Sequence, residues 1–373
     1  MAFNFETLQK TSPIWFRNAG AEGDVVLGIM GRLVRNLRGH AFPGWSTAEG
    51  RQAVASKLLP AILNSPGYKT AYHAEMNRLS YAHRRALLER RQISPCMAAR
   101  RDGCHLIISR KQDTVIMLNE EEHLAIHAFS AEADFPALLS RMQHLPEALS
   151  GTCDFAYDPR HGYLTSLPGE AGEGIQLYCV LHLPALTLSN MMPQVNRSID
   201  KLQLNISPFY PHLGEECGNI YVLYTAPIIR GALEEIHTHF TDIMQTLADR
   251  ENQVRSRLLE LHETGDIFLT NRINRCYGLL RYARALTQAE WVDALSMLRL
   301  GVSCGIIKPT ESTEEELLAQ LSCQLIRGGE YPLGEDIAPR SHPRAATAPE
   351  IDRCTNIREL LSSTTLLTDP RRI

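Results

Sequence analysis

The first regular apolar spacing lies in the N-terminal quarter of the chain and has a helical period. Val54, Leu58 and Ile62 recur every four residues after a polar stretch at residues 46–49 (STAE), which resembles a capping box. A second helical pattern covers residues 79–91, where cationic residues are interpreted as a solvated face. We therefore expect residues 15–92 to be helical.

From residue 105 the apolar spacing changes to that of short β-strands. β-prone runs broken by polar turns lie at residues 106–109, 114–118, 123–126, 154–157, 176–183, 204–207 and 218–224. Helical patterns interrupt them at residues 131–145 and 184–202. Strands in hairpin-like succession, with helices between them, predict an α+β fold with a largely antiparallel central sheet.

After residue 227 the pattern is helical again. An amphipathic repeat covers residues 228–262, and two further helices are expected to begin at Thr287 and Ser312, each followed three residues later by a glutamate. Residues 327–350 are rich in glycine and proline and predict a loop. The chain is thereby divided into a helical part at 15–92, an α+β part at 93–262, a helical module at 263–326, and a linker and tail at 327–373.

Composition and charge narrow the class of function. Of the 373 residues, 44% are hydrophobic and 21% are charged, which is typical of a soluble globular protein. The 38 Lys and Arg against 42 Asp and Glu give a net charge of −4, so neither nucleic acid nor a membrane surface is expected as the main partner. No apolar run approaches the ~20 residues of a membrane span, and the first residues do not resemble a signal peptide.

The cysteines and histidines give no sign of disulfide or metal chemistry. Nine cysteines are scattered without a C-x-x-C pair, so neither a disulfide framework nor a zinc site is expected. The fourteen histidines show no H-E-x-x-H pattern, so no protein-bound transition metal is expected. These features predict a reduced protein of the cytoplasm.

Four segments carry motifs that patterning alone does not explain. They are residues 24–43 (with DVVL, RLVRNL and FP), 119–124 (NEEEHL), 154–186 (with DFAY, GYLTS and LHLPAL) and 300–308 (with LG and GIIK). In order and spacing they resemble the ATP:guanido phosphotransferase family, and bacterial protein-arginine kinases most closely. The resemblance covers roughly residues 15–310. It implies the guanidino-kinase fold, with a mostly antiparallel central sheet flanked by helices, a small N-terminal helical region and a C-terminal helical module.

The family's reaction, transfer of the γ-phosphoryl group of ATP to a guanidinium, makes two demands on a site. A guanidinium stays protonated, so a carboxylate must orient it and accept its proton. The resemblance implies that Glu121 is this base, with Glu120 and His123 beside it. The triphosphate needs a cage of arginines together with magnesium, so ATP and Mg²⁺ are the implied cofactors. We expect the three residues to line one cleft with Arg32 and the loop at residues 167–176.

The arginine cage is largely absent. Of five positions at which the family has a cofactor-binding arginine, only Arg32 keeps it. The other four positions hold residues without a positive charge: Met30, Ala125, Gln176 and Ser207. Because one transition-state arginine is worth about 10³–10⁵ in rate in related phosphoryl-transfer enzymes, we expect ATP binding to be weak or lost.

The loop that carries the family's substrate cysteine is also changed. Leu167 replaces that cysteine, and Glu170 and Glu173 stand where the family has neutral Asn and Thr. Two carboxylates beside a triphosphate repel it. The loop therefore favours a cation rather than a nucleotide.

A last motif lies near the C-terminus. Residues 340–345 (RSHPRA) are similar to the R-D-x-x-R-A motif with which protein-arginine kinases recognise phosphoarginine, and Arg340 and Arg344 would be its arginines. Its aspartate is replaced by Ser341, and Pro343 does not fit inside a helix. We favour the other interpretation, a basic, proline-rich linker.

Three functions are compatible with these observations. A pseudokinase would keep the fold as a binding or regulatory protein. A divergent active kinase would use Arg32 with replacement cations such as Arg35, Arg110 or Lys111. A structural subunit would pair with an active paralogue. We favour the pseudokinase, for which the implied partners are arginine-containing substrate proteins, an active paralogue, or a second copy of the chain in a homodimer.

Overall fold

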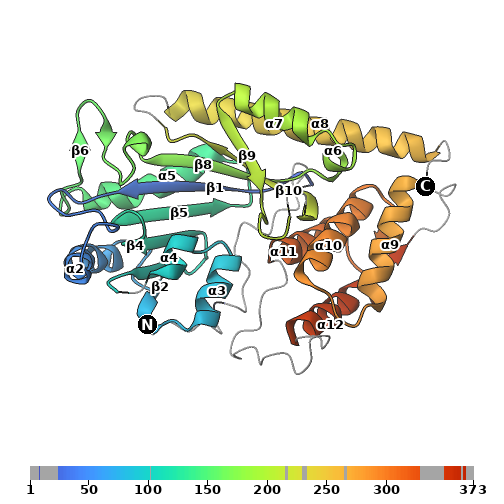
Figure 1. The fold of residues 1–373 in the computed structure, drawn as a ribbon, viewed down its shortest axis with the longest axis horizontal. Coiled ribbons are helices and arrows are strands. Elements are labelled where there is room, and N and C mark those ends of the chain that lie inside the picture. Colours follow the sequence, from blue (N-terminus) through green and yellow to red (C-terminus); the bar gives the residue numbers. More distant parts are fainter. Residues whose placement is uncertain are drawn as a thin grey trace. The chain divides into compact units, whose positions relative to one another are not determined.

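The computed structural model describes most of the chain. The described residues are 8, 24–100, 102–214, 217–228, 233–263, 267–327, 348–362 and 364–366. They divide into two compact units, whose elements are labelled in Figure 1. The first unit contains Gly28–Tyr178 and Tyr224–Asp242, and the second contains Phe16–Leu27, Cys179–Leu223 and Ile243–Ile373 as far as they are described.

An eight-stranded sheet has the strand order β2-β3-β4-β5-β1-β8-β10-β9. The pairs β2–β3, β3–β4, β4–β5 and β5–β1 are antiparallel, which confirms the predicted α+β fold with a largely antiparallel sheet. The strands of this sheet are β1 (Val26–Arg35), β2 (Tyr72–Glu75), β3 (His105–Ile108), β4 (Thr114–Leu118), β5 (Leu124–Ser130), β8 (Ile175–His182), β9 (Leu204–Pro208) and β10 (Ile220–Thr225). Two small ladders join β6 (Tyr157–Asp158) to β7 (Gly162–Tyr163) and β11 (Ile307–Pro309) to β12 (Thr364–Leu366).

Strand β1 contradicts the prediction that residues 15–92 are helical. It lies in the interior of the sheet, between β5 and β8, and most of its residues are buried on both faces. A strand buried on both faces lacks the alternation of polar and apolar residues that would mark it in the sequence. Residues 15–92, which also contain β2, are therefore not a separate helical part. The helices expected at 54–62 and 79–91 correspond to α2 (Ala48–Asn64) and α3 (Tyr81–Glu89).

The helices of the first unit lie beside this sheet (Figure 1). They are α2 (Ala48–Asn64), η2 (Met76–Arg78), α3 (Tyr81–Glu89), α4 (Pro95–Ala99), α5 (Phe135–Leu149) and η3 (Pro168–Glu170). Helix α5 turns an apolar face inward, and a side chain at Gly31 in β1 would collide with Met142 of this helix. Glycine at this position therefore leaves room for the end of the Met142 side chain against β1.

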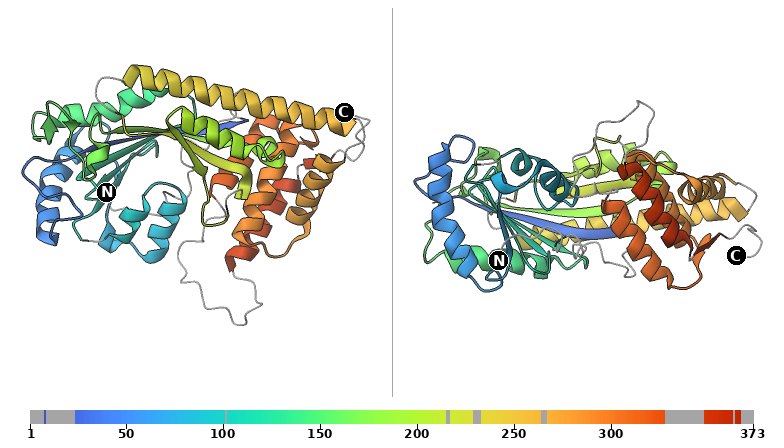
Figure 2. Two further views of the ribbon diagram at one scale, coloured as in Figure 1. Left: turned by 45° about the horizontal axis from the view of Figure 1, so that its top comes forward. Right: turned by 90° about the horizontal axis from the view of Figure 1, so that it is seen from below.

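Helix α10 (Gln288–Ser303) packs against α9 (Phe268–Tyr282) and α11 (Glu314–Arg327), and α12 (Ala348–Ser362) packs against α9 (Figure 2). The helices with residues in this unit are α6 (Pro184–Leu188), α7 (Met192–Lys201), η4 (Cys217–Asn219), α8 (Leu233–Glu263), α9 (Phe268–Tyr282), α10 (Gln288–Ser303), α11 (Glu314–Arg327) and α12 (Ala348–Ser362). Trp291 and most of the residues that follow it in α10 are buried, so this helix is the core of the helical module. The predicted capping box at Thr287 is confirmed, with both of its hydrogen bonds to Glu290.

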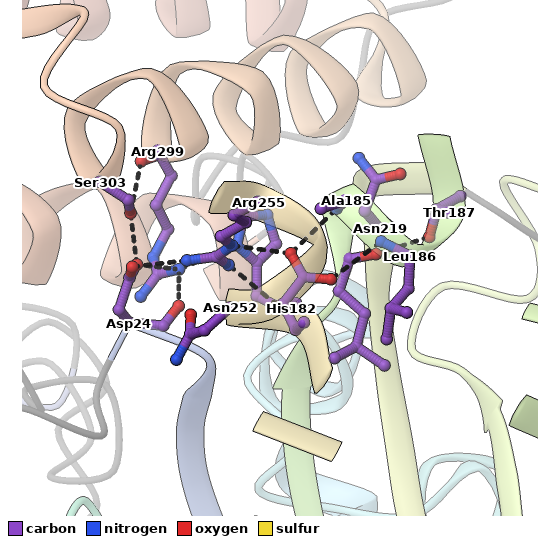
Figure 3. Close-up of polar contacts among 12 residues, drawn as sticks. Asp24, His182, Ala185, Leu186, Thr187, Asn219, Asn252, Arg255, Arg299 and Ser303 are labelled. Carbon is purple, nitrogen blue, oxygen red and sulfur yellow. Dashed lines mark hydrogen bonds and ion pairs between the residues drawn. The ribbon is translucent and has the colours of Figure 1, made fainter. Parts of the chain in front are cut away.

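A buried cluster of charges holds the second unit together (Figure 3). The Asp24 carboxylate lies 2.5 Å from Nη1 of Arg255 and 3.4 Å from Nη1 of Arg299, and it accepts a hydrogen bond from the Ser303 hydroxyl. Burial alone would raise the pKa of Asp24, but the two arginines bring it below its usual value. Asp24, the first residue of the first motif, therefore has a structural role in this unit.

Glu251 completes the cluster. Its carboxylate accepts hydrogen bonds from the backbone N–H groups of Ala185 and Leu186, at 2.9 Å each, and from Nε of Arg255 at 2.7 Å. It thereby satisfies two free N–H groups at the start of α6. The His182 imidazole is neutral. Its Nδ1 accepts a hydrogen bond from Nη1 of Arg299 (2.8 Å), and its Nε2 lies 2.8 Å from the Ser296 hydroxyl.

In the described part of the chain, no helix has the length and apolar character needed to cross a membrane. All nine cysteines are free thiols.

Candidate active site

Arg32 lies among three carboxylates in the first unit. Its Nη2 is 3.8 Å from a carboxylate oxygen of Glu120 and 3.8 Å from one of Glu121, and its Nη1 is 3.8 Å from one of Glu170. The Arg32 side chain is 12% exposed and the Glu120 side chain 3%, so this is a partly buried charge cluster. We call these four residues the Arg32 site.

The two glutamates of the NEEEH motif at this site differ in environment. Glu120 is buried and accepts hydrogen bonds from the Ser94 hydroxyl and from the backbone N–H of Glu121. The Glu121 side chain is half exposed. Burial and the adjacent Glu120 raise the pKa of Glu121, while Arg32 opposes the rise. An accessible carboxylate with a raised pKa can hold a guanidinium and accept a proton.

His123 does not face Arg32, contrary to our expectation. In the β5–β1 register Arg32 is paired with His127, four residues further along β5 and about 13 Å away at ~3.3 Å per residue. Nδ1 of His123 accepts from the backbone N–H of Leu37 (3.0 Å), and Nε2 lies 2.9 Å from the Ala41 carbonyl. Both ring nitrogens are therefore used to hold the loop that follows β1.

Glu122, which the sequence analysis did not single out, joins three of the motifs. Its buried carboxylate accepts from Nδ2 of Asn36 (2.6 Å) and from both the backbone N–H and the hydroxyl of Ser166. The side-chain oxygen of Asn36 in turn accepts from the backbone N–H of His123. Each of the three motifs supplies one of these residues. The presence of all three motifs in one chain was therefore the sequence signal that could have predicted this contact.

His127 is a second residue that sequence reasoning missed. It is the cross-strand neighbour of Arg32, and neither ring nitrogen has a hydrogen-bond partner among the described residues. Burial, assisted by Arg32, lowers the pKa of His127 to about 4. The imidazole is therefore neutral near pH 7 and adds no positive charge to the site.

The loop at residues 167–176 is held rigidly against β1. Gly174 has a φ of +61°, and a Cβ there would come within 2.8 Å of the Val34 carbonyl oxygen. Nη1 of Arg35 donates to the Glu173 carbonyl at 2.8 Å, and its guanidinium lies 3.4 Å from the ring centroid of Tyr163. Burial lowers the pKa of Arg35 to about 10. Arg35 thus fixes the loop and is not a replacement for a missing arginine, while Leu167 at the start of the loop is exposed.

The four positions that lack arginine have different surroundings. Met30 and Gln176 are half-buried in β1 and β8, whereas Ala125 in β5 is 0% exposed. The Gln176 side chain accepts from the hydroxyl of Tyr178, and that ring stacks on Tyr224 with centroids 5.7 Å apart. These neighbours are uncharged. Ser207 lies half-buried in β9 of the second unit.

The other proposed replacement cations, Arg110 and Lys111, lie in the turn between β3 and β4. Arg110 donates to the Thr70 carbonyl and lies over the ring of Tyr72. Both line a cavity described below, which contains none of the residues of the Arg32 site. Arg100, at the end of α4, is close enough to Glu121 for its positive charge to lower the pKa of that carboxyl group. It donates to the Pro43 carbonyl at 3.1 Å.

The proposed phosphoarginine residues Arg340 and Arg344 lie outside the described residues. Among the residues that are described, no group of three or more His, Cys, Asp or Glu is placed to hold a metal ion.

Two family models match the chain. The ATP:guanido phosphotransferase C-terminal catalytic domain matches residues 54–254, more than half of the chain, and the protein-arginine kinase McsB C-terminal domain matches residues 266–326.

Curated relatives and solved structures agree with this assignment. The protein-arginine kinase of Syntrophomonas wolfei is 32% identical over 293 residues, covering 77% of this chain and 80% of the relative. That of Moorella thermoacetica is 28% identical over 367 residues, covering 97% and 100%. Lombricine kinase has a similar fold, with a TM-score of 0.55 and 17% identity over 66% of this chain and 72% of its own. The duplicated taurocyamine kinase of Schistosoma mansoni with transition-state analogue components has a TM-score of 0.56 and 20% identity over 74% and 39%. The chain therefore belongs to the ATP:guanido phosphotransferase family, among the protein-arginine kinases.

Proposed function

We propose that this member of the family is a pseudokinase, a protein that keeps the kinase fold for binding or regulation without transferring phosphate. The observation that carries the proposal is the enclosure of Arg32 by Glu120, Glu121 and Glu170, each 3.8 Å away. Arg32 is the one cation left of the implied cage, and its charge is already balanced by carboxylates. It offers little attraction to a further anion.

The residues around Arg32 do not fit a triphosphate. A carboxylate about 4 Å from a phosphate is repelled by about 4 kcal/mol at an effective dielectric of ~20. Glu170 stands beside Arg32, and the positions of Met30 and Gln176 supply no compensating charge. Mg²⁺ would reduce the repulsion, but the arginines that position the γ-phosphate in the family would still be absent.

The carboxylate half of the site is better suited to a cation. Glu121 is half exposed, and the buried Glu120 beside it adds a second negative charge. A guanidinium donates to carboxylates in a planar, two-pronged geometry. We therefore propose that an arginine side chain of a partner protein binds at Glu121 and is not modified there. A substrate-like protein, an active paralogue or a second copy of this chain would each supply such a side chain, within the cytoplasm.

A divergent active kinase is the second candidate. The observation in its favour is Arg100, whose positive charge lowers the pKa of Glu121 although burial and Glu120 raise it overall. If Arg100 turned toward a bound nucleotide, it would replace one cation of the cage. Its guanidinium is at present engaged by the Pro43 carbonyl and the Cys96 sulfur.

Titration calorimetry separates the two candidates. Mg-ATP is titrated into this protein and, as the control, into the Moorella thermoacetica kinase under the same conditions. We expect saturable binding only in the control, whereas an arginine-containing peptide should bind this protein and lose affinity in Glu121→Gln. Saturable Mg-ATP binding that disappears in Arg100→Gln would contradict the loss of nucleotide binding and favour the divergent kinase instead.

A further inference from the structure

A cavity of about 460 Å³ lies in the first unit, lined by the α2–β2 connection, the β3–β4 turn and helix α5. We call it the turn cavity. Its lining residues come from three segments: Tyr68, the turn residues Ser109, Arg110, Lys111, Asp113 and Thr114, and Ser140, Arg141 and His144 of α5. It contains no residue of the Arg32 site, so it belongs to no function assigned above.

Three permanent cations converge on the turn cavity from separate segments. Arg110 and Lys111 come from the β3–β4 turn, and Arg141 comes from α5. Asp113 is the one acidic residue in the lining, so three positive charges face one negative charge. No ion pair in the described part of the chain involves Lys111, and the Lys111 side chain is exposed. The chain as a whole is acidic, so this local excess of positive charge is not a consequence of composition.

The Asp113 carboxylate is directed into the turn. One of its oxygens accepts from the Ser109 hydroxyl at 2.6 Å, and the other lies 3.9 Å from Nη1 of Arg141. The Ser109 hydroxyl oxygen also accepts from the backbone N–H groups of Asp113 and Thr114. Asp113 therefore holds the turn and keeps Arg141 at the cavity.

The two arginines of the turn cavity are held in place by the fold. Nη1 of Arg141 donates to the Phe129 carbonyl in β5 at 2.9 Å, which ties the guanidinium group to the sheet. Arg110 is fixed by the Thr70 carbonyl and by the ring of Tyr72 at 4.3 Å. A pre-organised set of donors loses little side-chain entropy when a ligand binds.

We propose that the turn cavity binds a phosphate group, carried either by a small molecule or by a phosphorylated protein segment. A tetrahedral phosphate accepts hydrogen bonds from several directions, which matches cations that arrive from separate segments. A planar carboxylate would match a single forked donor better. The volume is in the range of ligand sites and accommodates a phosphate with part of the molecule that carries it.

The test is titration calorimetry with inorganic phosphate at constant ionic strength, followed by a phosphoserine peptide and its unphosphorylated form. Ser140→Glu adds a carboxylate to the exposed wall of the cavity without removing a contact, and it should weaken phosphate binding at least about tenfold. The matched control Gln143→Glu adds the same charge to the same helix outside the lining, and it should change the affinity less than about twofold. Lys111→Gln combined with Arg141→Gln should weaken binding by about tenfold or more.

The peptide separates the two sources of the phosphate group. Tighter binding of the phosphorylated peptide than of inorganic phosphate assigns the cavity to a protein segment, and equal or weaker binding assigns it to a small molecule. Absence of saturable phosphate binding overturns the proposal. So does phosphate binding that is lost in Arg32→Gln and kept in Ser140→Glu, because the anion would then lie at the Arg32 site.

Discussion

Arg32 is the residue on which both candidate functions depend. To bind a triphosphate, Arg32 would have to leave Glu120, Glu121 and Glu170. Its attraction to each of these three carboxylates opposes that movement. The four positions without arginine are not equivalent either. Met30 and Gln176 are half-buried, but Ala125 is fully enclosed and is paired in the sheet with Val34 and Met117.

Arginine at position 125 is expected to destabilise the fold. Ala125→Arg adds a long charged side chain to a closed space, and we expect a loss of at least about 3 kcal/mol in the free energy of unfolding. Met30→Arg, at a half-buried position on β1, should cost less than about 1.5 kcal/mol. Urea denaturation of the two variants provides the comparison. Equal stabilities would show that position 125 has room for an arginine.

His127 is expected to make stability depend on pH. Its pKa is about 4 in the folded protein and ~6.5 in an unfolded chain, so between these values only the unfolded chain binds the proton. The free energy of unfolding should therefore fall as the pH is lowered from 6.5 to 4, by up to about 1.4 kcal/mol per pH unit from this group. His127→Leu should flatten the dependence by that amount, measured by urea denaturation at a series of pH values. Parallel curves for the two proteins would contradict the neutral state of His127.

The residues of the Arg32 site could largely be named from the sequence, but their roles could not. Glu120, Glu121 and Glu170 were named and lie at Arg32. His123 stands in the same motif yet binds the backbone of Leu37 and Ala41, more than 80 positions away in the chain. Local spacing cannot show which face of a strand meets such a distant loop. Glu122 escaped notice for the same reason, since its partners come from two other motifs.

At the scale of elements, periodicity predicted the longer helices and most strands of the sheet, but it failed for β1 and β2, which both lie in the part expected to be helical. The segments of β3, β4, β5 and β8 were expected as strands, whereas β1 was included in a helical part because it is buried on both faces. The helix starts predicted from caps at residues 46–49, 287 and 312 were within one residue of the observed caps, whereas the helix expected from residue 131 begins at Phe135. The cap of α2 is Thr47 rather than Ser46, and that of α11 is Thr313 rather than Ser312. Where two hydroxyl residues are adjacent, the sequence does not show which one caps.

The stability of the second unit is expected to depend on Glu251 in helix α8. Glu251→Gln places an amide where a buried carboxylate pairs with Arg255 and accepts two N–H groups at the start of α6. Breaking a buried ion pair by removing one partner costs about 3–5 kcal/mol. The exposed Glu260→Gln on the same helix should cost less than about 0.5 kcal/mol. Urea denaturation of both variants tests this, and a loss for Glu251→Gln no larger than that of the control would show that the cluster does not hold the unit.

At the scale of the whole molecule, fold and chemistry are separable. The sheet and the helical module are those of the family, and the contacts among Asn36, Glu122 and Ser166 join three motifs of this chain. We propose that the charge at the Arg32 site disfavours a nucleotide, because three carboxylates surround the one arginine retained there. A protein of this kind can keep a binding role after losing catalysis, since architecture and cofactor binding rest on different residues.

A phosphoryl-transfer assay tests the central proposal most directly. The protein is incubated with γ-³²P-labelled Mg-ATP and an arginine-rich protein, and acid-labile label on arginine is measured, with the Moorella thermoacetica kinase as the positive control. We expect label with the control enzyme and none above background with this protein, because the Arg32 site lacks the cations that hold and stabilise the transferred phosphate. Phosphoarginine formed by the unaltered protein, and abolished in Glu121→Gln, would contradict the pseudokinase assignment.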